Sequence, residues 1–394
     1  MSADNKVPEI RFKGVSGAWY EVALSSVIDI RSGKDYKHLG KGNIPVYGTG
    51  GYMLSVDSAL SNYDDAIGIG RKGTIDKPCI LRAPFWTVDT LFYAVPFPGF
   101  NLDFLFCLFQ KIEWKKHDES TGVPSLSKIA INNVSVYATN ELEQTAIGNY
   151  FQKLDSLINQ HQQKHDKLSN IKKAMLEKMF PKQGDTIPEI RFKGFSGEWA
   201  EIKFSEIFNE KDGIRRGPFG GSIKKEMFVA KSDYVVYEQR NAIYDRYDTR
   251  YNISREKYQE LINFSLASGD FIMSGAGTIG RVSRVPDGVK IGVFNQAIIR
   301  IKINDERVDS EFFLQWIRSE KMQERLTESN PASAMVNLVP MNELKAWDVV
   351  VPNKKEQTAI GNYFQKLDAL INQHRQQITK LNNIKQACLS KMFV

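Results

Sequence analysis

The sequence has few of the residues that build metal centres and disulfide frameworks. Its 394 residues include three cysteines and five histidines. The cysteines are far apart and form no C-x-x-C pair, and no histidine belongs to an H-E-x-x-H motif. These absences argue against a zinc site and against a disulfide-stabilised fold. We therefore expect reduced, structural thiols and a cytoplasmic protein.

Long apolar runs are also missing. The sequence has no uninterrupted apolar stretch of the roughly 18 residues that a transmembrane helix needs, and its opening, MSADNKVPEIRF, lacks the apolar core of a signal peptide. We expect no membrane association. The 53 Lys and Arg residues outnumber the 46 Asp and Glu residues, which gives a formal charge of +7. This modest excess favours a polyanionic partner without establishing one.

The sequence contains an internal duplication. VPEIRFKGVSGAW at 7–19 returns as IPEIRFKGFSGEW at 187–199, and a long segment at 143–180 returns at 356–393 with nine changes in 38 positions. The regions between these repeats, block A (about 25–142) and block B (about 205–355), look unrelated at first reading. We infer that the near-identical parts do one job twice, while each block does its own version of a second job.

The long repeated segment is predicted to be an amphipathic helix. Apolar residues such as Ile147 and Phe151 recur every three or four positions, and no proline interrupts the segment before Pro181. A continuous helix of about 38 residues would span roughly 55 Å. We expect the two copies to bury their apolar stripes as an antiparallel coiled coil, with His161 and His374 at equivalent seam positions. Packing of each helix on its own neighbouring domain is the alternative.

Blocks A and B are predicted to be divergent relatives of mixed α/β type. Strand-like stretches separated by turn residues run through both, followed by the helical stretches LDFLFCLFQKI and SEFFLQWIRSEKMQERL. A shift of 204 positions places Gly73-Thr74-Ile75 over Gly277-Thr278-Ile279. We expect an α+β chain with a pseudo-two-fold duplication. Its predicted parts are a first domain at 1–142, a helix at 143–181, a second domain at 187–355 with its repeat motif at 187–204, and a helix at 356–394.

Two glycine-rich stretches, GAGTIGR at 275–281 and GIGRKG at 68–73, match the dinucleotide-binding pattern G-x-G-x-x-G. That pattern needs a helix after the glycines, because the phosphates bind at the helix N-terminus. Here the glycines precede RVSRVPDGVKIGVF, whose Pro-Asp-Gly turn between β-branched residues predicts a hairpin. The two matches also fall in different frames of the aligned blocks. We therefore expect no nucleotide cofactor and interpret the shared G-T-I stretch as a tight loop between strands.

Basic, amide and hydroxyl side chains gather in the predicted loops of both blocks. Arg binds guanine and Asn or Gln binds adenine through paired hydrogen bonds, and glycine-rich loops let the backbone approach phosphates. For any single residue, an ordinary solvated loop is the alternative. The candidate DNA-contacting residues of block A are Lys34, Lys37, Lys41, Tyr47, Thr49, Arg71, Lys72 and Thr74. Those of block B are Arg215, Arg216, Lys224, Lys225, Gln239, Arg240, Asn241, Arg246, Thr278 and Arg281.

The repeated motifs resemble those of the specificity subunits of type I restriction–modification systems. The resemblance rests on the two PEIRFKG openings, IPVYGTGG at 44–51, GTIG at 277–280 and the EQTAIGNYFQKLD…KMF ending of each half, and it covers nearly the whole chain. It implies two target recognition domains that each read one half of a split, asymmetric DNA site, separated by an antiparallel coiled coil. It also implies assembly on double-stranded DNA with two methyltransferase (modification) subunits and with restriction–translocation subunits.

The resemblance implies a chain with no catalytic activity of its own. S-adenosylmethionine, ATP and Mg²⁺ would belong to partner subunits of a complex that is an adenine methyltransferase and an ATP-dependent endonuclease. A self-contained DNA methyltransferase is the main alternative. Against it, NPAS at 330–333 is the nearest match to the catalytic tetrapeptide [DN]-P-P-[YF], and it lacks the second proline and the aromatic residue. A structural coiled-coil scaffold is the other alternative, but it would not need two divergent basic domains.

Overall fold

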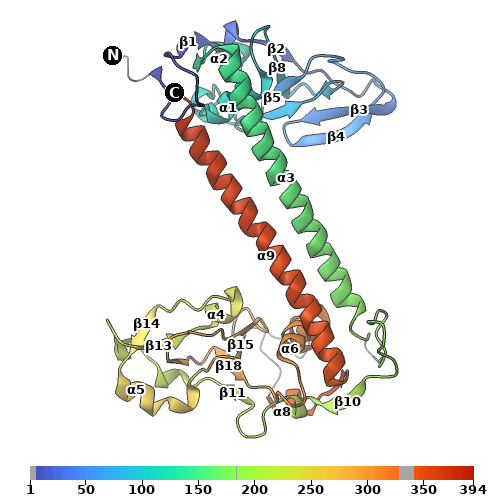
Figure 1. Ribbon diagram of the computed structural model, residues 1–394, viewed down its shortest axis with the longest axis vertical. Coiled ribbons are helices and arrows are strands. Elements are labelled where there is room, and N and C mark those ends of the chain that lie inside the picture. The colour runs from blue at the N-terminus through green and yellow to red at the C-terminus, as the bar shows by residue number, and fades with distance from the viewer. Residues whose placement is uncertain (1–5, 183, 328–340) are drawn as a thin grey trace. The chain divides into compact units, whose positions relative to one another are not determined.

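The structure is a computed structural model that describes residues 6–182, 184–327 and 341–394. The chain divides into two compact units: Met1–Lys164 with His374–Val394 (unit 1), and His165–Gln373 (unit 2). Each unit holds one globular domain and a part of each long helix (Figure 1). The NPAS stretch lies outside the described residues. No helix in the described ranges is long and apolar enough to cross a membrane.

Over its described residues, the domain of unit 1 contains three small sheets. The largest is antiparallel, in the order β2 (Ile28–Ser32), β8 (Leu91–Pro96), β5 (Ala66–Gly70) and β6 (Cys79–Leu81). The second has the order β4 (Gly51–Val56), β3 (Lys41–Gly48) and β7 (Trp86–Thr87), with β3 and β7 parallel. The third pairs β1 (Tyr20–Ala23) with β9 (Ser135–Ala138). All five residues of β5 are buried, as expected for a short apolar run between two partner strands.

The domain of unit 2 follows the same plan. Its antiparallel sheet has the order β11 (Ile214–Arg216), β18 (Ile298–Ile301), β15 (Phe271–Ser274) and β16 (Val282–Arg284). Its second sheet has the order β12 (Phe228–Val229), β14 (Tyr251–Ile253), β13 (Tyr234–Tyr237) and β17 (Gly292–Phe294), again with a parallel last pair. The third pairs β10 (Ala200–Lys203) with β19 (Asp348–Val351). This shared strand order agrees with the prediction that blocks A and B are divergent relatives.

Short helices complete both domains. Unit 1 has α1 (Leu102–Lys111), α2 (Lys128–Asn132), and the 3-10 helices η2 (Leu24–Ser26) and η3 (Trp114–His117). Unit 2 has α4 (Gln239–Tyr244), α5 (Arg255–Glu260), α6 (Ser310–Ile317), α7 (Glu320–Thr327) and α8 (Met341–Ala346), with the 3-10 helices η4 (Phe204–Ile207), η5 (Gly220–Ser222), η6 (Lys225–Met227) and η7 (Ile262–Phe264). The predicted helix of block A is α1.

Two local predictions for block B were wrong. Its single predicted helix is divided into α6 and α7. Between them, the Ser319 hydroxyl donates to the Trp316 carbonyl at 2.7 Å and accepts from the Met322 N–H at 3.5 Å, so Ser319 caps the start of α7. The predicted hairpin after GAGTIGR is absent, since β16 pairs with β15 while β17 joins the other sheet beside β13. Gly292 permits that pairing, because a Cβ there would lie 2.4 Å from the Val235 carbonyl oxygen.

The long helices are α3 (Glu141–Lys178) and α9 (Lys354–Lys391), and they pair in opposite directions within each unit (Figure 1). In unit 1 the Lys385 ammonium bonds to Asp155 at 2.6 Å, and His161 Nδ1 lies 2.8 Å from His374 Nδ1. In unit 2 the Lys172 ammonium bonds to Asp368 at 2.6 Å. Residue numbers on α9 fall as those on α3 rise, so the pairing is antiparallel, as predicted.

The repeated motifs form the same joint between domain and helix in each unit. Arg11 donates from Nε and Nη2 to the Glu143 carboxylate at 2.8 and 2.6 Å, and Arg191 donates in the same way to Glu356 at 2.8 and 2.6 Å. Both carboxylates belong to residues that are 1% exposed. The PEIRFKG and EQTAIG segments are therefore repeated because each unit needs this buried ion pair to attach its domain.

A glutamine and a glycine complete each joint. Gln144 accepts from the backbone N–H of Asn101, which caps α1, and Gln357 accepts from the backbone N–H of Asp309, which caps α6. The next turn of each long helix presents a glycine, Gly148 or Gly361, because a Cβ on Gly148 would lie 2.4 Å from Asn101 Oδ1. Two residues after the end of each long helix, a phenylalanine packs into a core: Phe393 stacks on Phe104 in unit 1, and Phe180 packs against Phe364 in unit 2.

Candidate nucleic-acid interface

The G-T-I stretches form equivalent loops, as predicted. Residues 71–78 join the antiparallel strands β5 and β6, and residues 275–281 join β15 and β16. Gly73 and Gly277 have φ of +95° and +66°, a left-handed backbone that favours glycine. Because a strand follows each loop and no helix does, neither loop has the setting of a dinucleotide site.

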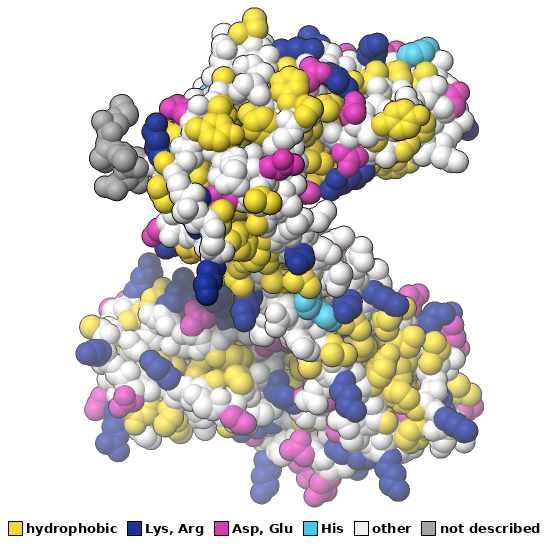
Figure 2. All heavy atoms as spheres, turned by 45° about the horizontal axis from the view of Figure 1, so that its top comes forward, with side chains coloured by type: hydrophobic (Ala, Val, Ile, Leu, Met, Phe, Trp, Pro, Cys, Tyr) yellow, Lys and Arg dark blue, Asp and Glu magenta, His cyan; other side chains and the backbone are white. Residues whose placement is uncertain are grey.

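The basic candidates of block A are exposed. Lys34, Lys37, Lys41 and Lys72 are all exposed and form no ion pair with any residue that the structure describes. Arg71 is also exposed, and its guanidinium lies 5.7 Å from the centre of the Phe92 ring. On the face drawn in Figure 2, Lys and Arg side chains are interspersed with acidic and hydrophobic ones. These cations are therefore available to a ligand without first breaking a salt bridge.

The β3–β4 hairpin carries the hydroxyl candidates of block A. Thr49 lies in its turn, and half-buried Tyr47 packs edge-on against Tyr52 with ring centres 6.4 Å apart. Tyr52 is 62% exposed and presents its ring to solvent beside the turn. Thr74, in the G-T-I loop, is half-buried and its hydroxyl bonds to no described residue. The hairpin thus combines a rigid tyrosine pair with an open, glycine-rich turn.

In block B, Arg215 and Arg216 lie on β11 with different surroundings. Arg215 is half-buried and bonds to Asp212 at 3.0 Å, whereas Arg216 is exposed and has no ion pair among the described residues. Burial alone would raise the pKa of Asp212, but Arg215, Arg300 and Lys302 outweigh burial and hold that pKa below its ordinary range. Lys224 and Lys225 are exposed at the start of η6.

The remaining candidates of block B lie on or beside α4. Arg240 bonds to Asp248 at 2.8 Å, and Arg246 is 74% exposed at its side chain. Asn241 is 1% exposed: its amide accepts from the Glu238 N–H and donates to the carbonyls of Arg246 and Asp248. Asn241 therefore shapes this loop from inside. Gln239 is half-buried, and its Oε1 is buried without a hydrogen-bond partner in the described part of the chain.

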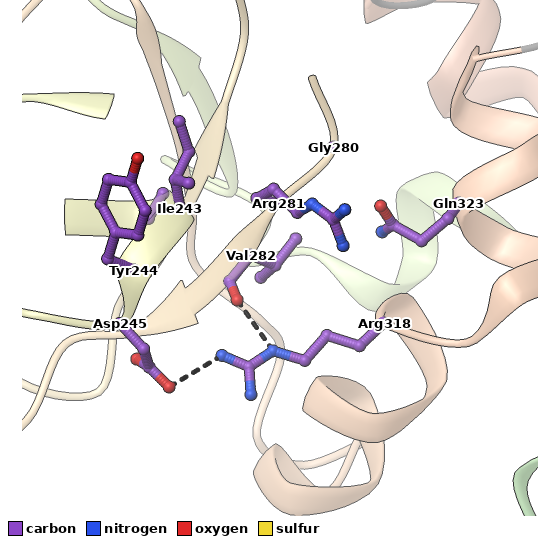
Figure 3. Close-up of a pocket in the computed structure, with 9 residues that line it drawn as sticks. Ile243, Tyr244, Asp245, Gly280, Arg281, Val282, Arg318 and Gln323 are labelled. Carbon is purple, nitrogen blue, oxygen red and sulfur yellow. Dashed lines mark hydrogen bonds and ion pairs between the residues drawn. The ribbon is translucent and has the colours of Figure 1, made fainter. Parts of the chain in front are cut away.

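Thr278 and Arg281 lie on the same loop, and Arg281 borders a pocket of about 330 Å³ in unit 2. Both residues are exposed, and Arg281 has no ion pair within the described ranges. Arg318 forms the opposite wall, where Nε donates to the Val282 carbonyl at 2.8 Å and Nη2 bonds to Asp245 at 3.0 Å. Figure 3 shows the Arg281 and Gln323 side chains pointing toward one another across this pocket.

Two strongly exposed aromatic residues were missed as candidates. Tyr63 is 95% exposed, and Phe219 is 93% exposed within GPFGG, next to the basic residues of β11. Aromatic faces stack on nucleobases, so residues of this kind suit a nucleic-acid interface. The aromatic residue flanked by glycines in GPFGG is the sequence signal that could have identified Phe219. Among the described residues, no group of three or more His, Cys, Asp and Glu side chains is placed to hold a metal ion.

Known proteins are similar to this chain in sequence and in fold. The family model for the type I restriction modification DNA specificity domain matches residues 197–383. The type I restriction enzyme MjaVIII specificity subunit of Methanocaldococcus jannaschii is 19% identical over 292 residues, which covers 71% of this chain and 66% of that protein. The crystal structure of a type I restriction–modification S subunit from M. genitalium has a TM-score of 0.62 and 15% identity, and covers 98% of this chain and 99% of that chain.

A chain from a structural study of complex assembly and conformational transition in a type I restriction–modification system has a TM-score of 0.51 and 13% identity, with 95% and 97% of the two chains covered. Two related α/β domains, each joined to a pair of antiparallel helices, are the fold that this chain shares with these solved structures. Residues 197–383 of this chain therefore match the type I restriction modification DNA specificity domain, and the chain as a whole is similar in fold to a type I restriction–modification S subunit.

Proposed function

We propose that this chain is the sequence-specific DNA-binding subunit of a type I restriction–modification complex, and that the domain of each unit reads one half of a bipartite, asymmetric site. One observation carries the proposal: the two domains share their strand order and joint contacts but differ where they present side chains to solvent. The β3–β4 connection is residues 49–50, whereas the equivalent β13–β14 connection is residues 238–250 and includes α4. Two readers with one scaffold and different loops suit two different half-sites.

The charge of the loops supports double-stranded DNA as the ligand. Each domain presents cations that have no acidic partner among the described residues, including Lys34 and Lys72 in unit 1 and Arg216 and Lys225 in unit 2. Such cations gain affinity from phosphates through counterion release. The guanidinium groups on and beside α4, together with the tyrosines of the β3–β4 hairpin, supply the hydrogen-bonding and stacking groups that base recognition needs.

The long helices are proposed to set the gap between the half-sites and to hold the partner subunits. The repeat gives each helix an equivalent outward leucine, Leu157 on α3 and Leu370 on α9, and each is 43% exposed. Equivalent surfaces on two helices suit two copies of one partner. We assign these surfaces to two methyltransferase subunits, with restriction–translocation subunits joining the assembly.

We propose no catalytic role for the chain itself. In this scheme the methyltransferase subunits hold S-adenosylmethionine, and the restriction–translocation subunits use ATP and Mg²⁺. Adenine methylation and ATP-dependent cleavage therefore belong to the assembled complex, which acts in the cytoplasm. In this scheme the chain determines which DNA sequence the complex binds.

Selection from a randomised duplex pool tests the proposal. The chain, assembled with its methyltransferase subunits, is incubated with the pool, and the bound duplexes are sequenced. We expect two short defined half-sites separated by an unspecified gap of constant length. A single uninterrupted site, or no enrichment at all, would contradict the proposed function. Methyltransferase subunits alone serve as the control and are expected to enrich nothing.

A further inference from the structure

The two G-T-I loops are alike in sequence and in backbone conformation. In each loop a left-handed glycine is followed by a threonine and then by a buried isoleucine: Ile75 is 1% exposed and Ile279 is 8% exposed. Each loop has an exposed cation two residues after that isoleucine, Lys77 or Arg281. The blocks around these loops have diverged, so the loops have one job in common.

The loops present unused hydrogen-bond donors. The backbone N–H groups and the hydroxyls of Thr74 and Thr278 bond to no residue that the structure describes. A Cβ on Gly73 or Gly277 would meet nothing within 4 Å, so space in front of each loop is open. Neither Lys77 nor Arg281 has an ion pair in the described ranges. A free N–H, a free hydroxyl and an unpaired cation on one loop suit an anion with several acceptor oxygens.

The pocket of unit 2 shows why Arg281 is the group that remains available there. Asp245 neutralises the second cation of the pocket, Arg318, and also accepts from the Ser283 hydroxyl. Arg281 therefore supplies one uncompensated positive charge at the pocket (Figure 3). A phosphodiester carries one negative charge. Gly280 brings the loop close to α7, because a Cβ there would lie 3.0 Å from Gln323 Oε1.

We infer that each G-T-I loop binds one backbone phosphate of the target DNA, with Lys77 as the cation in unit 1 and Arg281 in unit 2. This inference rests on the proposed function and deepens it. Phosphates are identical in every sequence, so two readers of different half-sites can keep the same phosphate contact, whereas their base contacts must differ. The concave site at the loop of unit 2 also suits a projecting phosphate better than a base edge, which lies recessed in its groove. Base reading then falls to the connections that differ, 49–50 and 238–250.

Salt-dependent binding by the assembled complex tests this assignment. The probes are a selected duplex and a duplex of the same length with both half-sites scrambled. Removing one phosphate contact lowers the slope of log K against log salt by about one and weakens binding roughly fivefold at 0.15 M salt. We expect Arg281→Gln and Lys77→Gln each to show this loss equally on both duplexes. Arg281→Lys keeps the charge and is expected to restore the slope.

Two controls separate the possible outcomes. Arg307→Gln removes an exposed arginine that is already paired with Glu206, and we expect it to leave the slope unchanged. Arg240→Ala, on α4, is expected to relax discrimination at one half-site. The phosphate assignment is overturned if Arg281→Gln weakens only the selected duplex, if it changes nothing, or if Arg281→Lys fails to restore the slope. Failure of the proposed function differs, because the unaltered complex would then bind both duplexes equally.

Discussion

The ion pair in each joint gives a prediction whose size follows from its burial. Arg11→Met keeps the length of the side chain but leaves the Glu143 carboxylate buried, with hydrogen bonds remaining only from Trp19 Nε1 at 3.2 Å and from the Thr139 hydroxyl. Breaking a buried ion pair by removing one partner costs about 3–5 kcal/mol. We therefore expect unit 1 to lose about that much free energy of unfolding.

Hydrogen exchange followed by mass spectrometry measures the loss in each unit separately. Protected amides of unit 1 should exchange roughly 100- to 5,000-fold faster in Arg11→Met, because each 1.4 kcal/mol is a factor of ten. Arg191→Met is the matched variant, and it should accelerate exchange in unit 2. Lys203→Met breaks an ion pair whose side chains are 55% and 51% exposed, so its expected cost is about 1 kcal/mol or less.

Two results would refute the claim that the repeated ion pair attaches each domain to its long helix. One is an Arg11→Met protein whose unit 1 exchanges as slowly as the unaltered chain. The other is an equal acceleration of both units by either variant, because each ion pair lies entirely within one unit.

Three further predictions concern the same joints and the long helices. Burial raises the pKa of Glu143, but hydrogen bonds from Arg11 and Thr139 outweigh burial and lower that pKa below its ordinary value of 4.5. The stability that the Glu143 carboxylate adds is therefore present above pH 4.5 and is lost as the pH falls through the lower native pKa. Acid unfolding of unit 1, followed by hydrogen exchange with Glu143→Gln as the control, checks this. Gly361→Ala should destabilise unit 2 by about 1–3 kcal/mol in urea unfolding, since a Cβ there would lie 2.8 Å from Phe312 N, whereas exposed Asn383→Ala should be neutral or slightly stabilising. Seven residues inserted in matching turns of α3 and α9 should lengthen the unspecified gap by about three base pairs, because seven helical residues rise roughly 10 Å, and duplex selection should find both half-sites unchanged.

The helices and the pairing of the two halves were predictable because their signals are local or repeated. The three- and four-residue spacing of apolar residues in the long segments encodes α3 and α9 directly. Because the segment is duplicated, the apolar face of each long helix has a second, equivalent helix to pack against. The pairing of β17 with β13 was not predictable, because it depends on Gly292 admitting the Val235 carbonyl, a contact between distant parts of the chain.

The candidate interface was predictable in composition and less so in the role of each residue. Lysines in glycine-rich turns are exposed, as their surroundings suggest, and Lys34 and Lys37 are examples. Asn241 shows why the role of a residue is harder to predict than its type. The sequence does not distinguish an asparagine that contacts a base from one that holds a loop, and only the fold shows that the amide of Asn241 is used in internal hydrogen bonds. Phe219 was missed because charge and hydrogen-bonding type, not aromatic exposure, guided the choice.

The central claim is that the two domains read independent half-sites. Its most direct test replaces residues 25–142 with the equivalent block of another type I specificity subunit and maps methylated adenines across the genome of cells that carry the exchanged or the unaltered chain. We predict that one half of the methylated site changes while the other half and the gap stay the same. A change in both halves, or in neither, would contradict the claim.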